Sequence, residues 1–90
     1  MAKRSQNPNA YILGIKNTKK GVHSRESILM ALDEEVLSTK DVMGKTNLSY
    51  SALLYHLRLL EKHTLVRRRP RSKRQIIWEQ TGLGQQPILN

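Results

Sequence analysis

Residues 49–63 carry the clearest hydrophobic pattern in the chain. Leu53, Leu57 and Leu60 recur at spacings of four and three positions, which places them on one face of an α-helix. Ser49 stands just before the run and suits an N-cap, because its hydroxyl can accept a hydrogen bond from an amide of the first turn. The segment contains neither Gly nor Pro. We therefore predict a helix over residues 49–63 whose leucine face is buried.

A weaker apolar stripe upstream predicts a helix from about Ser24 to Glu35. Its buried side would consist of the apolar residues at helical spacing, Ile28, Leu29, Leu32 and Val36. Before this helix, residues 17–21 are predicted to form a polar, basic loop, and residues 7–9 (Asn-Pro-Asn) a turn or a disordered arm. The apolar run over residues 10–15 is compatible with a strand or a helix, since Gly14 weakens both.

A second short helix is predicted from the residues that follow Ser38. Ser-Thr-Lys-Asp over residues 38–41 matches a capping box in which Asp41 replaces the more common Glu. Val42 and Met43 would face inward, and Gly44 would end the helix as a left-handed C-cap. Two short helices with a tight connection between them, as expected over residues 38–63, form a helix-turn-helix.

Beyond residue 63 the pattern changes from helical to extended. Residues 65–69 and 75–79 have β-branched or aromatic character, and the Pro-Arg-Ser-Lys stretch between them is typical of a hairpin turn. The expected fold class is α+β, mostly helical: a winged helix-turn-helix of three helices plus a β-hairpin wing. We expect a domain over residues 23–80, a basic arm with a short apolar segment over residues 1–22, and a tail over residues 81–90.

The net charge of +9 is located on the two flanks of this domain. Residues 1–22 contain five basic residues and no acid, and residues 67–74 contain six basic residues and no acid. Residues 25–62 hold five bases and six acids, a net of −1. Positive charge concentrated on these two flanks favours a polyanionic partner such as nucleic acid.

Composition removes several other classes of function. The chain has no Cys, so disulfides and thiolate metal sites are excluded. No apolar run approaches a membrane span of roughly 18 residues, and residues 1–22 lack the apolar core of a signal peptide, so we expect an intracellular, cytoplasmic protein. His56 and His63 are too far apart on one helix to hold a metal together, so no metal or cofactor is predicted. No acid–base pair, phosphate loop or nucleophile motif is evident, so we predict no catalytic residue and no enzyme.

A resemblance to a known family adds to this interpretation. Residues 48–68, LSYSALLYHLRLLEKHTLVRR, are similar to the LSxSxVSxHLxxLxxxGLVxxR run of winged helix-turn-helix transcription factors, most of all the ArsR and MarR types. The resemblance implies a DNA-binding regulator, usually a homodimer, with the helix over residues 49–63 in the major groove and the wing on the backbone or minor groove. In the cell such a protein would be nucleoid-associated. Thr64 stands where the family usually has Gly, so the end of this helix must be strained or built differently.

The candidate site residues form three groups, all directed at double-stranded DNA. The base-reading set on the predicted helix combines hydroxyl, aromatic and cationic groups: Ser49, Tyr50, Ser51, Leu54, Tyr55 and Arg58. The wing cations are candidate phosphate ligands: Arg67, Arg68, Arg69, Arg71, Lys73 and Arg74. Thr39 and Lys40, at the start of the second helix, are candidate phosphate contacts because helix N-termini bind phosphate.

Further expectations concern single residues and the two ends of the chain. Leu54 suits a thymine methyl group or a protein contact. His56 is expected to pack and form a hydrogen bond beside the second helix, and Trp78 to lie in the core. Apolar residues near the ends have no obvious place in the core and suggest a dimer contact or an extra strand or turn: Tyr11, Ile12, Leu13, Ile15, Ile88 and Leu89.

Three alternative functions stay open at this stage. A non-specific architectural DNA-binding protein fits the charge and the small size. A winged-helix protein-interaction module would use Leu54 and the wing to contact another protein. A weak likeness to the Zα domains that bind left-handed DNA involves residues 53–57 with Pro70 and Trp78.

Overall fold

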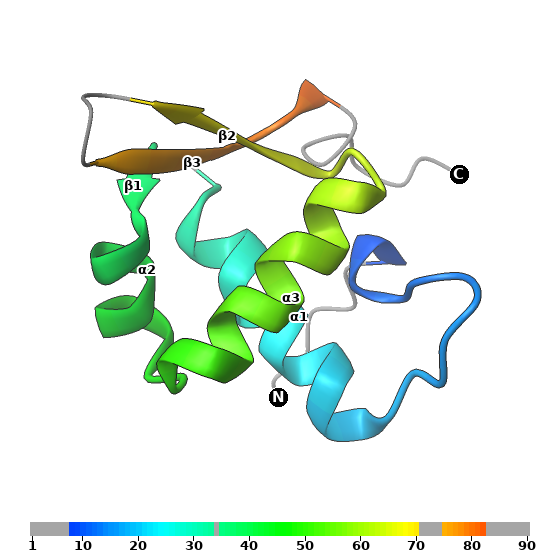
Figure 1. The fold of residues 1–90 in the computed structure, drawn as a ribbon. Coiled ribbons are helices and arrows are strands. Elements are labelled where there is room, and N and C mark those ends of the chain that lie inside the picture. Colours follow the sequence, from blue (N-terminus) through cyan, green and yellow to red (C-terminus); the bar gives the residue numbers. More distant parts are fainter. Residues whose placement is uncertain (1–7, 34, 71–74, 83–90) are drawn as a thin grey trace.

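The computed structural model describes residues 8–33, 35–70 and 75–82. Three helices lie beneath a small sheet whose two long strands extend above α2 and α3 (Figure 1). The elements are, in chain order, η1 (Pro8–Ala10), α1 (Lys19–Ala31), β1 (Leu37–Ser38), α2 (Thr39–Thr46), α3 (Tyr50–Lys62), β2 (Val66–Pro70) and β3 (Ile76–Gln80). This arrangement confirms the predicted winged-helix fold class.

The core lies where the three helices and the sheet meet. Leu53, Leu57 and Leu60 of α3 are completely buried, as their spacing predicts. Ile28 and Leu29 of α1 pack into the same cluster. The sheet contributes Trp78, which is 2% exposed, so the prediction of a core tryptophan is confirmed. Burial of these large apolar side chains is the main driving force for folding in a domain of this size.

Helix α1 begins and ends earlier than the sequence predicts. Its N-cap is Thr18, whose hydroxyl accepts a hydrogen bond from the Gly21 amide, so residues 19–21 of the predicted loop belong to the first turn of the helix. The helix ends at Ala31, and Val36 is 46% exposed instead of buried. The early end lets the chain turn before β1, where Leu37 is buried in place of Val36.

Helix α2 extends past its predicted end. Ser38 caps it as expected, with its hydroxyl accepting from the Asp41 amide. Gly44 does not take the C-cap role; Asn47 does, with a left-handed φ of 62° and an amide that donates to the Met43 carbonyl. Asn tolerates this conformation better than most residues because its short polar side chain can form hydrogen bonds with the nearby backbone.

The sheet has one strand that the sequence analysis missed. Strands β2 and β3 form the predicted hairpin, each shifted by one residue from its predicted bounds. Residues 37–38, for which no strand was predicted, form β1 and pair antiparallel with β3, giving the order β1-β3-β2. The central strand β3 therefore joins the wing directly to the start of α2.

The segment before α1 folds back onto its own domain. Ile12 is buried in the core, and Ile15 packs against it, so these two side chains need no partner subunit to cover them. Arg25, itself buried, fixes this segment: its Nε donates to the Ala10 carbonyl at 2.6 Å and Nη2 to Asn17 Oδ1 at 2.9 Å. Residues 11–15 are irregular instead of forming a strand or helix.

Helix α3 ends in a Schellman motif with Thr64 at the left-handed position. The Leu65 amide donates to the Leu60 carbonyl and the Thr64 amide to the Glu61 carbonyl, both at 2.9 Å. Thr64 has a φ of 61°, the region that favours Gly. The expectation of a strained helix end is therefore confirmed. Within the described ranges, none of the helices has both the length and the apolar character needed to cross a membrane.

Candidate nucleic-acid interface

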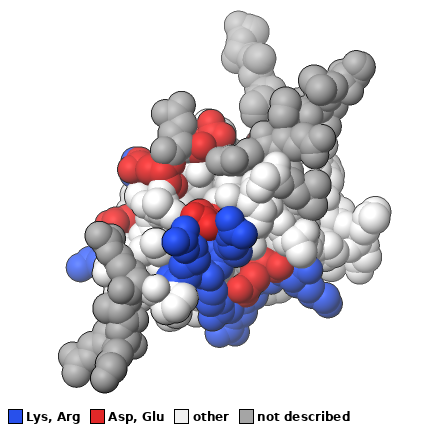
Figure 2. Space-filling model, turned by 90° about the horizontal axis from the view of Figure 1, so that it is seen from above, with Lys and Arg blue, Asp and Glu red and all other residues white. Residues whose placement is uncertain are grey.

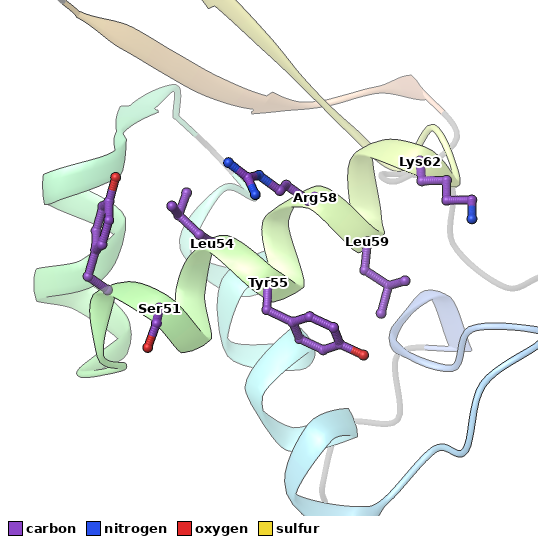
Figure 3. A pocket seen from close by; sticks show the side chains of 7 residues that line it. Ser51, Leu54, Tyr55, Arg58, Leu59 and Lys62 are labelled. Carbon is purple, nitrogen blue, oxygen red and sulfur yellow. The ribbon is translucent and has the colours of Figure 1, made fainter.

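The side of α3 opposite its buried leucines is open and bears the predicted base-reading residues. Tyr50 is 59% exposed and Tyr55 56% exposed. Together with Leu59 and Lys62, five of the six predicted residues line an open depression of about 470 Å³: Tyr50, Ser51, Leu54, Tyr55 and Arg58. Figure 3 shows these side chains along α3, with Leu54 and Arg58 directed toward the sheet and Tyr55 and Leu59 away from it.

Ser49, the sixth predicted residue, has a structural task. Its hydroxyl accepts a hydrogen bond from the Ala52 amide at 3.2 Å and caps α3. Leu59 and Lys62 were missed by the sequence analysis, although they follow Tyr55 and Arg58 by one helical turn and the i, i+4 rule places them on the same face.

Tyr55 is held by a chain of contacts that begins inside the domain. Its ring meets the His56 ring edge to face, with 4.9 Å between centroids. His56 is buried, and its Nδ1 lies 3.3 Å from Nη1 of Arg25. Because a guanidinium only donates, Nδ1 must be the acceptor. This hydrogen bond of His56 is therefore made with α1, and the predicted hydrogen bond beside α2 was wrong.

The same cluster keeps His56 neutral. Burial lowers the pKa of His56, and the nearby charge of Arg25 lowers it further. Burial also lowers the pKa of Arg25, partly offset by Tyr55. A neutral imidazole can accept a hydrogen bond from the guanidinium. The lowered pKa of His56 therefore agrees with the contact between its Nδ1 and Nη1 of Arg25.

The described wing arginines are paired with carboxylates. Arg67 Nε lies 2.6 Å from Glu79 Oε2, and Arg69 Nη1 lies 3.1 Å from Glu79 Oε1. The hydrogen bond from Arg67 is the largest effect and lowers the pKa of Glu79; desolvation opposes it, and the hydrogen bond from Arg69 lowers the pKa further. Basic and acidic side chains lie next to one another on this side of the molecule (Figure 2). Arg67 and Glu79 are directly opposite in the observed hairpin register, which the sequence alone does not fix.

Arg68 connects the wing to the end of α3. It grips Glu61 with two hydrogen bonds, Nε to Oε2 at 2.9 Å and Nη2 to Oε1 at 2.7 Å. The hydrogen bond lowers the pKa of Glu61 and raises the pKa of Arg68. The guanidinium also lies 5.2 Å from the centre of the Trp78 ring, within the range of a cation–π contact. The predicted wing residues Arg71, Lys73 and Arg74 lie outside the described residues.

At the start of α2, Thr39 and Lys40 have different surroundings. The Trp78 indole Nε1 donates to Thr39 Oγ1 at 2.8 Å, which occupies the hydroxyl as an acceptor and leaves its proton available. Lys40 is exposed. In the described part of the chain, no group of three His, Cys, Asp or Glu residues is placed to hold a metal ion.

Comparison with known proteins gives one structural match and no sequence match. Neither protein-family profiles nor curated protein sequences match this chain. The chain is similar to the solved structure of a mutant form of Lactococcus lactis ZitR, with a TM-score of 0.64 and 23% sequence identity. The match covers 88% of this chain and 56% of that one, so the chain spans little more than half the length of this neighbour. The likeness shows a shared winged-helix fold.

Proposed function

We propose that this protein is a sequence-specific regulator of transcription that binds double-stranded DNA. In this proposal α3 lies in the major groove and the wing, residues 67–74, contacts the backbone or the minor groove. The observation that carries the proposal is the exposed face of α3, where hydroxyl and aromatic groups share one surface with Arg58 and Lys62. A helix of 13 residues spans about 20 Å, which is long enough to cross a major groove roughly 12 Å wide.

Electrostatics support a polyanionic partner for this face. Among the described residues, two cations and no acid line the depression. The nearest carboxylate in sequence, Glu61, is already engaged by Arg68. Arg58 and Lys62 lie in the second half of α3, where they suit phosphate, while the first half presents Ser51 and the tyrosines to base edges.

The structural likeness to ZitR supports the same proposal at the level of fold, since winged helices commonly present their third helix to DNA. Fold alone does not fix function, so the proposal depends on the side chains of α3. We further propose a homodimer in a cytoplasmic, nucleoid-associated setting, as the family resemblance implies. Tyr11 and Leu13 are exposed apolar residues available for a dimer contact.

The test is a selection of bound duplexes from random DNA, followed by affinity measurements. The wild-type protein should bind a selected duplex roughly 10³-fold more tightly than a random one at the same salt concentration. Ser51→Ala should cost roughly 1–3 kcal/mol on the selected duplex and much less on random DNA. Ser27→Ala on α1, where the hydroxyl donates to the His23 carbonyl, is the matched control and should leave both affinities unchanged.

Equal binding to selected and random duplexes would refute sequence specificity and favour the architectural alternative. The apolar character of Leu54 and Leu59 favours a second candidate, a protein-interaction module. That function predicts no measurable DNA binding by the wild-type protein at low salt, which the same titration detects.

A further inference from the structure

The first two turns of α3 present an unusual set of groups for a helix that reads DNA. The side chains that line the depression there are the exposed Tyr50, Ser51 and Tyr55 and the partly buried Leu54. Arg and Lys pair bidentately with guanine, and Asn and Gln with adenine. None of these four residue types occurs between Tyr50 and Leu57. The part of the helix that would meet base edges therefore lacks the usual hydrogen-bonding readers of both purines.

Leu54 is partly buried, but unlike Leu48 and Leu59 it is not among the residues that pack against the hydrophobic core. It lies instead on the wall of the depression, one helical turn before Arg58 and directed toward the same side (Figure 3). The apolar surface of Leu54 that stays open to solvent gains free energy only when a partner covers it.

Among the four bases, thymine alone carries an apolar group in the major groove, its C5-methyl. The positive charge of the depression favours nucleic acid as the partner. Arg58 and Lys62 are its charged residues, and none of the described acids lines it. A protein surface that matched this face would need acidic groups around an apolar centre, whereas a duplex supplies both phosphates and methyl groups along one groove.

Resting on the proposed function, we propose that Leu54 reads thymine methyl groups, so that the preferred site carries thymine at the position this residue meets. Tyr50 and Tyr55, on either side of it in sequence, supply apolar ring surface and a hydroxyl each. Specificity at this position then comes from methyl contact instead of bidentate hydrogen bonding.

The experiment removes the methyl groups from the DNA and leaves the base pairing unchanged. A duplex recovered by selection with thymidine is resynthesised with deoxyuridine at each thymine in turn and at all of them. Affinity is measured by fluorescence anisotropy at constant salt. The wild-type protein should lose about fourfold for each thymine whose methyl it contacts, the change expected for burying one such group.

Two variants connect this loss to Leu54. Leu54→Ala should bind the thymine and deoxyuridine duplexes with equal affinity at the critical position, since the methyl no longer has a partner. Met30→Ala is the matched control: Met30 is 66% exposed and lies on α1, outside the depression, so this variant should keep the wild-type loss of about fourfold. The DNA substitution cannot affect folding, so the result does not depend on the stability of either variant.

Several outcomes would overturn the inference. A wild-type protein that prefers the selected duplex yet binds its deoxyuridine form equally well keeps the proposed function and loses this inference. The inference also fails if Leu54→Ala retains the full thymine preference. Tighter binding to the single strand than to the duplex would identify the tyrosines as stacking surfaces and overturn it too. A protein that selects no duplex removes both proposals.

Discussion

Replacing Thr64 with Gly should stabilise the domain. Thr64 has a φ of 61° at the left-handed position of the Schellman motif that ends α3. This conformation costs an L-residue roughly 1–2 kcal/mol, and a β-branched one is a true outlier there. Gly removes that strain, but its greater freedom in the unfolded chain offsets about 0.4–1 kcal/mol of the gain. The net stabilisation should be roughly 0.5–1 kcal/mol.

This gain is measurable by thermal and urea unfolding. For a domain of this length, 1 kcal/mol shifts Tm by roughly 4–8 °C, so Thr64→Gly should raise Tm by about 2–8 °C. The hydrogen bond from the Thr64 amide to the Glu61 carbonyl is made by the backbone and survives the substitution. The substitution removes the hydrogen bond from Thr64 Oγ1 to the His63 carbonyl, which is exposed and contributes little.

Asn47→Gly is the matched control. Asn47 ends α2 with nearly the same φ, 62°, but Asn adopts this conformation at much lower cost. Its replacement should therefore change the free energy of unfolding by less than about 0.5 kcal/mol, or lower it slightly through the unfolded state. The reasoning is refuted if Thr64→Gly leaves Tm unchanged, or if both variants gain equally.

Four further outcomes are expected. Glu79→Gln releases Arg67 and Arg69 from their carboxylate, so affinity for any DNA should rise and its salt dependence should steepen; an unchanged salt slope in a titration would count against a wing–DNA contact. Arg25→Met should lower the free energy of unfolding in urea by about 2–4 kcal/mol, because buried acceptors lose their donor. The pKa of His56 is lowered in the folded state, so as pH falls the imidazole is protonated first in the unfolded chain. The free energy of unfolding should therefore decrease below about pH 6.5, and His56→Gln should flatten that decrease. Sedimentation at micromolar concentration should show a dimer, with and without DNA, and a persistent monomer would refute that part of the proposal.

Strong periodicity made part of the fold predictable. The bounds of α3 were predicted within one residue, because burial on one face of a helix leaves a regular pattern in the sequence. The two wing strands were predicted within one residue from their β-branched and aromatic residues. The start of α1 was missed because Gly21 and two lysines look like a loop, although the cap at Thr18 was present. Strand β1 was missed because two residues are too few to show alternation.

The site was only partly accessible to the same reasoning. One helical face groups five of the six expected α3 residues, since helix geometry fixes which side chains are neighbours. The contacts of the wing depend on tertiary structure instead. Glu61 forms an ion pair with Arg68 across the junction of α3 and β2. His56 contacts Arg25, which lies 31 positions earlier in the chain. No local sequence pattern reveals either contact.

The paired arginines of β2 bear on how long a complex would last. Each described guanidinium of the wing already holds a carboxylate, so contact with a phosphate would be an exchange between two anions. Glu61 and Glu79 remain tethered beside the vacated arginines at a high effective concentration and compete continuously for their return. Such a wing would attach and release quickly. The residence time on a given site would then be set by α3, while the wing permits rapid transfer between neighbouring positions on the duplex.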